Sequence, residues 1–456
     1  MSMQTIDDNI KGILELNEKI SENSINKNIC VFGQGFVGLP LALSFAFRGC
    51  NVVGVDVDKN LVDETNNGET HHTETFHNVS IKTILNLMLE EKRYKATIDA
   101  ENAVKQSNNI IVTVGIPIKN GEYILDYLEN ACINIGKNLK KGDLVIIRST
   151  VIPGTTEEVC RPILEKYSGL KSGQDFYLAY ASERIAEGFA FEEFANMPTL
   201  VGAINEESLK RASEVLGIVC KADIVGSSCI KAVETSKVFE NVQRDLNIAM
   251  SQEFARFTEG LGIDIFEVIK LANTHSRVNL LTPGPGVGGY CIPNAYHYIE
   301  PKAKDLDLDM SILKLARAKN ADLPKFFVEK AEELLEKKGK KLSDVNVAVF
   351  GLAMKDFSND DRISPSVDIC KLLLERGAKL KAFDPIVPTK YDFKVNTEEE
   401  LLKNADLIFI LTKQNSMNFN CDELKKYTNK EAIIIDTKAV IQKDEAEKSG
   451  FTYWRI

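Results

Sequence analysis

The stretch NICVFGQGFVGLPLALSFAFRG, residues 28–49, decides the fold of the first half of the chain. It predicts an apolar strand over 28–33, a glycine-rich turn over 33–38, and a helix over 39–48 that Gly49 closes. A second strand, 51–57, follows, so the stretch is typical of a βαβ unit. Further strands expected at 109–114 and 144–148, each after a helical pattern, predict a parallel, doubly wound α/β sheet.

The turn fits the pattern GxGxxG of dinucleotide-binding units. Gly33 permits the tight turn, Gly35 lets a pyrophosphate approach the backbone, and Gly38 allows close packing of helix on strand. Asp56 ends the next strand, about 20 residues on. An acid at that position accepts a hydrogen bond from a ribose hydroxyl and repels a 2′-phosphate. We therefore expect NAD rather than NADP, bound by a set of residues around this turn: Gly33, Gly35, Phe36, Val37, Gly38 and Asp56.

The second half repeats this pattern. A strand at 345–350, a turn at Gly351, a helix over 367–376 and a strand over 380–383 that ends in Asp384 predict a second Rossmann-like domain. Two later strands are expected at 405–411 and 432–436. The run Gly351-Leu-Ala-Met-Lys355 lacks the second and third glycines, so no second dinucleotide site is expected, although a lysine at a helix start suits a phosphate.

The middle of the chain loses its strand pattern. Apolar residues recur every three or four positions from Val238 to Leu261, which predicts one long helix buried along that stripe. We expect the cleft between the two α/β domains to hold the active site, because ligands bind beyond the carboxyl ends of parallel strands. The expected division is a helical leader at 1–27, an NAD-binding domain at 28–228, a helical connector at 229–335 and a second Rossmann-like domain at 336–456.

Composition excludes several classes of protein. The 456 residues carry 56 Lys and Arg against 66 Asp and Glu, a net charge of −10, so a nucleic-acid-binding surface is not expected. The first residues lack a signal-peptide pattern and no apolar run is long enough to span a membrane, so we expect a soluble, cytoplasmic protein. The nine scattered cysteines form no CxxC pair, which predicts neither disulfides nor a zinc site and mostly buried thiols.

One stretch combines glycine, proline and cysteine in an unusual way. Residues 283–293, PGPGVGGYCIP, hold four glycines and three prolines, a backbone for which we see no packing requirement. A cysteine on such a loop is accessible to substrate, so Cys291 is expected to be a nucleophile rather than a buried structural thiol.

From about residue 28 onward the chain resembles the nucleotide-sugar 6-dehydrogenase family, and most closely its UDP-N-acetylhexosamine branch. The matching runs, in order, are GQGFVGLP at 33–40, RSTVIPGTT at 148–156, SERIAEG at 182–188, ETSKVFENVQRDLN at 234–247, HSRVN at 275–279, PGPGVGGYCIP at 283–293, GLAMK at 351–355, DDRISP at 360–365 and FDP at 383–385.

The resemblance implies an NAD-dependent, four-electron oxidation of a sugar C6 alcohol to a carboxylate, in polysaccharide biosynthesis. It assigns the nucleophile to Cys291 and assigns proton handling and oxyanion stabilisation to Lys237 and Asn241. It assigns the orientation or deprotonation of the hydrolytic water to Glu183 and Thr150, and Thr150 is also expected to bind the cofactor. UDP-glucose as substrate, or a catalytically impaired nucleotide-sugar binder, remain the alternatives.

The resemblance also implies a set of substrate contacts and makes the last domain the UDP-sugar-binding one. The contacts, beside Lys237 and Asn241, are Arg184, Ile185, Glu187, Arg244, His275, Arg277, Gly288, Lys355 and Arg362. In the family one arginine can come from a neighbouring subunit, which implies a homodimer or a higher homo-oligomer.

The chain departs from the family pattern at several positions. Four residues after Cys291 the usual aspartate is Ala295, so either His297 or another acid replaces it, or thioester hydrolysis is slow. Lys413-Gln-Asn415 also replaces a more usual acidic, histidine-bearing run. The histidine-rich segment 68–78 suggests either a metal site or a solvated loop, and a solvated loop is the preferred interpretation, so no metal is expected.

Overall fold

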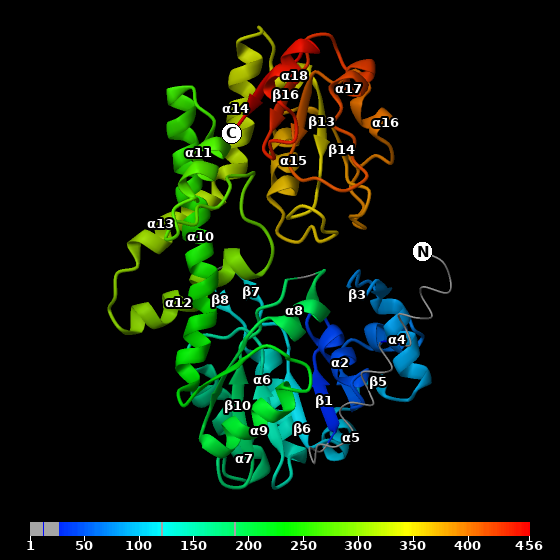
Figure 1. The fold of residues 1–456 in the computed structure, drawn as a ribbon, viewed down its shortest axis with the longest axis vertical. Helices are drawn as coiled ribbons and strands as arrows, with labels where there is room; N and C mark the ends of the chain where they lie inside the picture. Colours follow the sequence, from blue (N-terminus) through cyan, green and yellow to red (C-terminus); the bar gives the residue numbers. More distant parts are fainter. Residues whose placement is uncertain (1–11, 13–26, 120–121, 187) are drawn as a thin grey trace. The chain divides into compact units, whose positions relative to one another are not determined.

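The computed structural model describes residue 12 and residues 27–119, 122–186 and 188–456, which form two compact units (Figure 1). The first unit contains the described residues up to Phe239 together with His297–Leu306, and the second contains Glu240–Tyr296 and Asp307–Ile456. The helical leader expected at 1–27 lies almost entirely outside the described residues. The expected division of the chain into four parts stays a prediction.

The first unit is built on an eight-stranded sheet of order β12-β11-β10-β9-β6-β1-β2-β5, in which only the β10–β11 pair is antiparallel. The expected strands are present as β1 (Asn28–Phe32), β2 (Asn51–Val55), β6 (Asn109–Val112) and β9 (Leu144–Ile147). Sequence reasoning did not identify β5 (Tyr94–Thr97), β10 (Tyr177–Ala181), β11 (Thr199–Ala203) or β12 (Ile224–Ser227).

Helices and two short hairpins complete this unit. The helices are α2 (Gly38–Ala46), α3 (Lys59–Asn66), α4 (Ile81–Glu90), α5 (Ala100–Gln106), α6 (Asp126–Asn138), the π-helical turn η1 (Thr156–Cys160), α7 (Arg161–Ser168), α8 (Ala190–Asn196) and α9 (Glu206–Leu216). The hairpins pair β3 (Thr75–Phe76) with β4 (Val79–Ser80), and β7 (Ile118–Lys119) with β8 (Glu122–Tyr123).

The second unit holds a five-stranded, fully parallel sheet of order β14-β13-β15-β16-β17. Its strands are β13 (Asn346–Phe350), β14 (Lys379–Phe383), β15 (Leu407–Ile410), β16 (Ile433–Asp436) and β17 (Thr452–Arg455). Its helices are α11 (Ile265–Ala272), α13 (Ser311–Ala321), α14 (Leu323–Glu336), the 3₁₀ turn η2 (Leu342–Asp344), α15 (Pro365–Glu375), α16 (Glu398–Leu402), α17 (Cys421–Tyr427) and α18 (Lys443–Lys448). Helices α10 (Ile230–Leu261) and α12 (Cys291–Asp305) run through both units.

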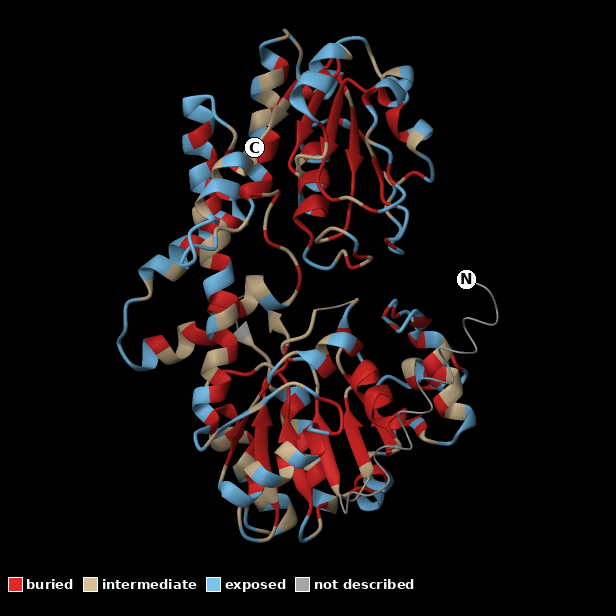
Figure 2. Ribbon diagram, viewed as in Figure 1, coloured by how far each residue is buried: buried red, intermediate tan, exposed pale blue. Residues whose placement is uncertain are grey.

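The central strands of both sheets are buried on both faces, as Figure 2 shows in red. In β6, β9, β15 and β16 every residue is buried, because helices cover both sides of a parallel sheet and consecutive side chains then point into two cores. This arrangement confirms two Rossmann-like, doubly wound α/β domains joined by a long central helix. Among the described residues, no helix has the length and apolarity needed to cross a membrane.

The long helix α10 is present as expected, but the burial of its apolar stripe is not. Val238 and Val242 are 1% and 6% exposed, whereas Phe254, Phe257 and Leu261 are 41%, 67% and 59% exposed. The prediction of a buried stripe is therefore wrong for the last two turns. Periodicity identifies one face of the helix, but it does not identify what covers that face.

Candidate functional site

The glycine-rich turn between β1 and α2 has the geometry that the sequence predicts. Gly33 has a φ of +85°, and a Cβ at Gly38 would lie 1.7 Å from the carbonyl oxygen of Gly33, so neither position accepts a side chain. At Gly35, which is exposed, a Cβ would meet nothing within 4 Å. The backbone at Gly35 is therefore open to a ligand from outside, which is what a pyrophosphate site requires.

Asp56 is held at the end of β2, facing this turn. Its Oδ2 accepts the N–H of Gln34 at 2.7 Å and its Oδ1 accepts the N–H of Asp58 at 3.0 Å. Each oxygen keeps a lone pair that a ribose hydroxyl can use. Sequence reasoning missed Gln34, whose buried amide accepts a hydrogen bond from the hydroxyl of Tyr94 at 2.7 Å and so fixes the turn from beneath.

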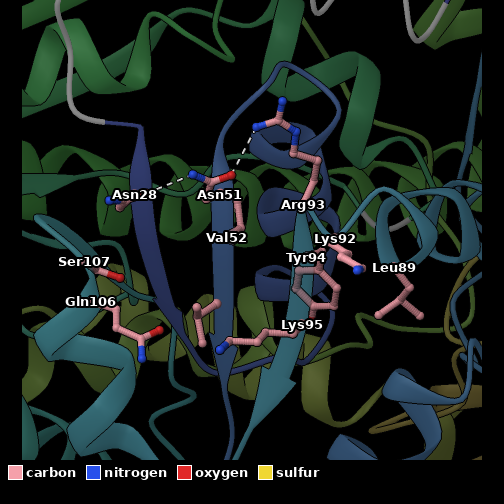
Figure 3. Close-up of a pocket in the computed structure, with 11 residues that line it drawn as sticks. Asn28, Asn51, Val52, Leu89, Lys92, Arg93, Tyr94, Lys95, Gln106 and Ser107 are labelled. Carbon is pink, nitrogen blue, oxygen red and sulfur yellow. Dashed lines mark hydrogen bonds between the residues drawn. The ribbon is translucent and has the colours of Figure 1, made fainter.

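A cavity of about 510 Å³ lies elsewhere in this unit (Figure 3). Its lining comes from the first residues of three strands, among them Asn28, Asn51 and Tyr94, and from Lys92 and Arg93. The strands begin here, and the dinucleotide turn follows the end of β1. This cavity is therefore at the opposite edge of the sheet and is not the cofactor site.

The second Rossmann-like domain has a counterpart of Asp56, but the carboxylate of that counterpart is buried and already hydrogen-bonded. Asp384 at the end of β14 is 1% exposed, and its Oδ2 accepts the N–H groups of Leu352 and Ala353 at 2.9 and 3.2 Å. The side-chain amide of Gln414 donates to both carboxylate oxygens at 3.3 and 3.4 Å. The glutamine that departs from the family pattern thus donates to the carboxylate that would otherwise be open to a ribose hydroxyl, in a domain that also lacks a second GxGxxG.

Glu183 is buried and its carboxylate is already bonded on both oxygens. Oε1 accepts the N–H groups of Arg184 and Ile185 at 2.7 and 2.8 Å, and Oε2 accepts Nε of Arg148 at 2.7 Å. Arg148 is itself only 5% exposed, and sequence reasoning did not single it out. The pair fixes the start of the run Ser182–Gly188 at the carboxyl edge of the sheet. Glu187 lies outside the described residues.

The start of helix α10 is anchored by a second buried carboxylate that sequence reasoning missed. Glu234 is 0% exposed and accepts the N–H groups of Gly154 and Thr156 at 2.6 and 2.9 Å. Burial raises the pKa of Glu234, although these hydrogen bonds act in the opposite direction. Glu234 lies one turn before Lys237, so its bonds fix the helix register relative to the loop that begins with Thr150.

Lys237 and Asn241 are 7% and 6% exposed. Their spacing of four residues on one continuous helix puts both side chains on the same face. An ammonium and an amide on one face make a donor pair suited to an oxyanion. Thr150 is half-buried and lies just beyond β9. The loop that follows it is bonded to the same helix, because the N–H of Gly154 donates to Glu234.

The glycine-rich cysteine loop is shaped by packing, contrary to the sequence-based expectation. A Cβ at Gly288 would lie 2.8 Å from three atoms, belonging to Met354, Ile363 and Pro365, and a Cβ at Gly286 would lie 2.7 Å from Pro365. The N–H of Gly289 also donates to the carbonyl of Ile363 at 3.2 Å. The loop thus lies directly on the two segments of the second domain, GLAMK and DDRISP, and only glycine permits that approach.

Cys291 is exposed and is the first residue of helix α12. Of the nine cysteines, only it and Cys229 are exposed, which confirms that most are buried thiols. Ala295, one turn into the helix, is 1% exposed, and His297 lies beside Glu300 with 3.7 Å between Nδ1 and Oε2. The N–H groups at a helix start are donors for a developing oxyanion.

The predicted basic contacts differ in their surroundings. Arg362 is paired with Asp360 through two side-chain hydrogen bonds of 2.8 and 2.7 Å, and Arg184 donates to the carbonyl of Pro198 at 2.9 Å. Lys355 is half-buried. The remaining predicted contacts, Arg244, His275 and Arg277, are exposed.

The predicted site residues divide between the two units. The first unit carries Gly33, Gly35, Phe36, Val37, Gly38, Asp56, Thr150, Glu183, Arg184, Ile185 and Lys237, and the second carries Asn241, Arg244, His275, Arg277, Gly288, Cys291, Lys355 and Arg362.

The histidine-rich segment 68–78 is not a solvated loop, and that interpretation is wrong. Residues 71–77 alternate between exposed and buried, so His72, Glu74 and Phe76 point inward. The side chains of His72 and Glu74 are 0% and 1% exposed, with 3.5 Å between Nδ1 and Oε2. In the part of the chain that the structure describes, no group of three histidine, cysteine or acidic side chains is arranged to hold a metal ion.

Comparisons with known proteins identify one family. Three models of the UDP-glucose/GDP-mannose dehydrogenase family match the chain: the NAD binding domain over residues 27–219, the central domain over 231–322 and the UDP binding domain over 348–443. The UDP-N-acetyl-D-mannosamine dehydrogenase of Pyrococcus horikoshii is 34% identical over 415 residues, which cover 91% of this chain and 96% of that protein.

Solved structures give the same result. The structure of UDP-D-ManNAc dehydrogenase from Pyrococcus horikoshii matches with a TM-score of 0.85 at 33% identity, covering 94% of this chain and 98% of that chain. The NDP-N-acetyl-D-galactosaminuronic acid dehydrogenase from Methanosarcina mazei Go1 matches with a TM-score of 0.81 at 30% identity, covering 97% of each chain. The chain therefore belongs to the UDP-glucose/GDP-mannose dehydrogenase family and is an NAD-dependent nucleotide-sugar dehydrogenase.

Proposed function

We propose that this enzyme oxidises the C6 alcohol of UDP-N-acetyl-D-mannosamine to a carboxylate in two steps, through a covalent intermediate on Cys291. The observation that carries the chemistry is an exposed thiol at the start of a helix, at the end of a loop clamped by Met354, Ile363 and Pro365. The choice of sugar rests on the relatives, whose names give N-acetyl-D-mannosamine, and on the match of the family motifs in this chain.

The turn at Gly33–Gly38 and Asp56 would hold NAD, which accepts a hydride in each oxidation. In the first oxidation the C6–H bond breaks and the hydroxyl proton passes to a base, giving an aldehyde. The Cys291 thiolate then adds to that aldehyde, and loss of a second hydride leaves a thioester. Water hydrolyses the thioester to the carboxylate and the free thiol.

The other residues have supporting roles in this proposal. Lys237 and Asn241 donate hydrogen bonds to the oxygen on C6 as it gains charge. Glu183 and Thr150 orient the hydrolytic water, since Oε2 of Glu183 keeps one lone pair beyond its bond from Arg148. The basic residues, among them Arg362 and Lys355, bind the pyrophosphate. The active-site cleft expected between the two α/β domains stays a prediction.

The stoichiometry of NADH formation tests the proposal. With excess NAD, UDP-N-acetylmannosamine should yield about two NADH per sugar, and UDP-N-acetylglucosamine, UDP-N-acetylgalactosamine and UDP-glucose should react more slowly. Cys291→Ala should abolish the second oxidation, with Cys229→Ala, the other exposed cysteine, as the matched control. Unchanged turnover in Cys291→Ala would refute the assignment of Cys291 as the nucleophile.

Ala295 supports a second candidate, a nucleotide-sugar binder with impaired catalysis. The position that carries an acid in the family is here an apolar side chain, 1% exposed. This candidate predicts NAD binding without NADH formation from any of the four sugars. If hydrolysis limits an active enzyme, Ala295→Asp should raise turnover, and a burst of NADH in the unaltered protein should disappear.

We also propose that the enzyme is a homodimer or a higher oligomer, in the cytoplasm. The apolar side chains of Phe254, Phe257 and Leu261 on α10 and of Leu271 on α11 are exposed, and exposed apolar side chains of this kind are typical of positions that a second copy covers. Light scattering should give at least twice the 50.8 kDa of one chain, and Phe257→Glu should lower that mass. A monomer at all concentrations would refute this assignment.

A further inference from the structure

The buried pair of His72 and Glu74 has no place in the reaction proposed above. It lies in the extended segment 71–77, in which alternate residues are buried. Two ionisable side chains at 0% and 1% exposure are costly to bury unless each is paired, so the pair needs a reason to be there. Burial raises the pKa of Glu74, but the neighbouring His72 and the backbone N–H groups around the carboxylate, among them that of Gly188, outweigh it and lower that pKa.

On one side the pair contacts the dinucleotide turn. The ring of Phe36, inside that turn, meets His72 edge-on with 5.3 Å between ring centroids and an interplanar angle of 64°. Phe36 meets His71 in the same way at 5.3 Å, and the two histidine rings stack at 4.5 Å. The segment is therefore in direct contact with the loop that approaches the pyrophosphate.

On the other side the pair contacts the run Ser182–Gly188. Oε1 of Glu74 accepts the N–H of Gly188 at 3.3 Å, across 114 positions of sequence. Gly188 has a φ of +92°, a conformation that depends on glycine and on the contacts that hold it. This run carries Glu183, to which the proposed function gives the hydrolytic water, and Arg184 and Ile185, which the family resemblance places against the sugar nucleotide.

In the described part of that run, carboxylates accept the N–H groups of residues 184, 185, 186 and 188. Glu183 accepts the N–H groups at positions 184 and 185, and Glu193 accepts the N–H of Ala186. Glu183 and Glu193 belong to the neighbouring sequence, whereas Glu74 comes from beyond β2. Among these three carboxylates, Glu74 is therefore the one that relates the end of the run to the dinucleotide turn.

We propose that Glu74, supported by His72, is a positioning residue that sets the sugar-binding run Ser182–Gly188 relative to the NAD turn. This inference rests on the proposed function, because the run must contact the sugar. Loss of the Glu74 carboxylate frees Gly188 and the run moves, while the turn at Gly33–Gly38 keeps its own hydrogen bonds. The affinity for the sugar then falls and NAD binding does not.

Steady-state kinetics of the full-length enzyme test this inference. Glu74→Ala should raise KM for UDP-N-acetylmannosamine about tenfold, with a smaller fall in kcat and with the Kd for NAD within about twofold of wild type. Glu74→Gln keeps an oxygen for the N–H of Gly188 and should restore most of the lost affinity. Glu69→Ala, in the histidine-rich segment 68–78 but with a side chain that is 60% exposed, is the matched control and should behave as wild type.

A cycle with Gly188→Ala covers the case in which one variant folds poorly. No atom lies within 4 Å of a Cβ at position 188, so this change acts through backbone conformation rather than through a clash. If Glu74 acts through Gly188, the effects of Glu74→Ala and Gly188→Ala on KM are not additive. Additive effects, or a wild-type KM in Glu74→Ala, would overturn the inference.

Calorimetry separates failure of this inference from failure of the proposed function. If the unaltered protein oxidises UDP-N-acetylmannosamine and Glu74→Ala has the same KM for it, the positioning role alone is refuted. If the unaltered protein binds the sugar nucleotide but does not oxidise it, the proposed function fails. The positioning role is then supported if Glu74→Ala weakens the Kd for the sugar nucleotide, and it is refuted if that Kd is unchanged. A protein that neither oxidises nor binds it overturns both.

Discussion

Gly288→Ala is the sharpest test of how the cysteine loop is held. The added Cβ would lie 2.8 Å from the carbonyl oxygen of Ile363, Cβ of Met354 and Cδ of Pro365, which is 0.6 Å short of the 3.4 Å where ordinary contact begins. Gly288 does not have a positive φ, so the effect is steric and not conformational. Two of the three atoms belong to backbone or to a proline ring, so the loop rather than its neighbours must move.

The expected loss follows from that displacement. Cys291 lies three residues further on, and a misplacement of about 1 Å at a reacting group costs roughly 100-fold in rate. A shift of about 0.6 Å therefore predicts a fall in kcat of about tenfold to 100-fold, with a stability loss of about 1–3 kcal/mol from overpacking. NADH absorbance gives kcat, and thermal unfolding gives the stability.

Gly284→Ala is the matched control for this variant. It lies in the same loop, and a Cβ there would meet nothing within 4 Å. It should keep kcat within about twofold of wild type, and both variants should bind NAD normally because the dinucleotide turn belongs to the other compact unit. Wild-type kcat in Gly288→Ala, or an equal loss in Gly284→Ala, would refute the steric reasoning.

Three further predictions concern the buried groups. Brief alkylation at about pH 8 should modify Cys291 and spare Cys50, since burial raises the pKa of the Cys50 thiol to about 12; peptide mass mapping measures this, and early labelling of Cys50 would contradict it. Asp245→Asn should cost about 1–3 kcal/mol in urea unfolding, because it removes the charge partner of the half-buried guanidinium of Arg317, 3.0 Å away; an unchanged stability would contradict it. Glu234→Gln should cost about 1–3 kcal/mol, since one of two backbone N–H groups then faces an amide NH₂. Because burial raises the pKa of Glu234 above its ordinary 4.5, its contribution to stability falls as pH rises from 4.5 through the raised value, and the variant should lack this pH dependence in unfolding measured between about pH 5 and about pH 8.

Local pattern was enough to predict the parts of the fold that have a strong local signal. The strand, turn and helix at 28–48 and their repeat at 345–376 were predicted within two or three residues, because apolar strands and glycine turns are coded by adjacent residues. The strands β10, β11 and β12 were not identified. β12 is half exposed in the sequence IVGS, and β11 pairs antiparallel to its neighbour, so their place in the sheet depends on pairing with distant segments.

The sequence by itself determined the class of enzyme to which the chain belongs. GxGxxG followed by Asp56 indicated a dinucleotide turn, and the family motifs predicted a nucleophile, its donors and the basic contacts, because each of these predictions depends on residue type and short spacing. The long helix and the second Rossmann-like domain also follow from periodicity alone.

Only the tertiary structure decided how these residues are held. It showed that the glycines of the cysteine loop are required by contact with Met354 and Ile363, and that Glu234 and Glu74 join segments 80 and 114 positions apart. It also reversed the interpretation of the histidine-rich segment. Such contacts leave no periodic or spacing signal, because a buried carboxylate finds its partners across the fold and not along the chain.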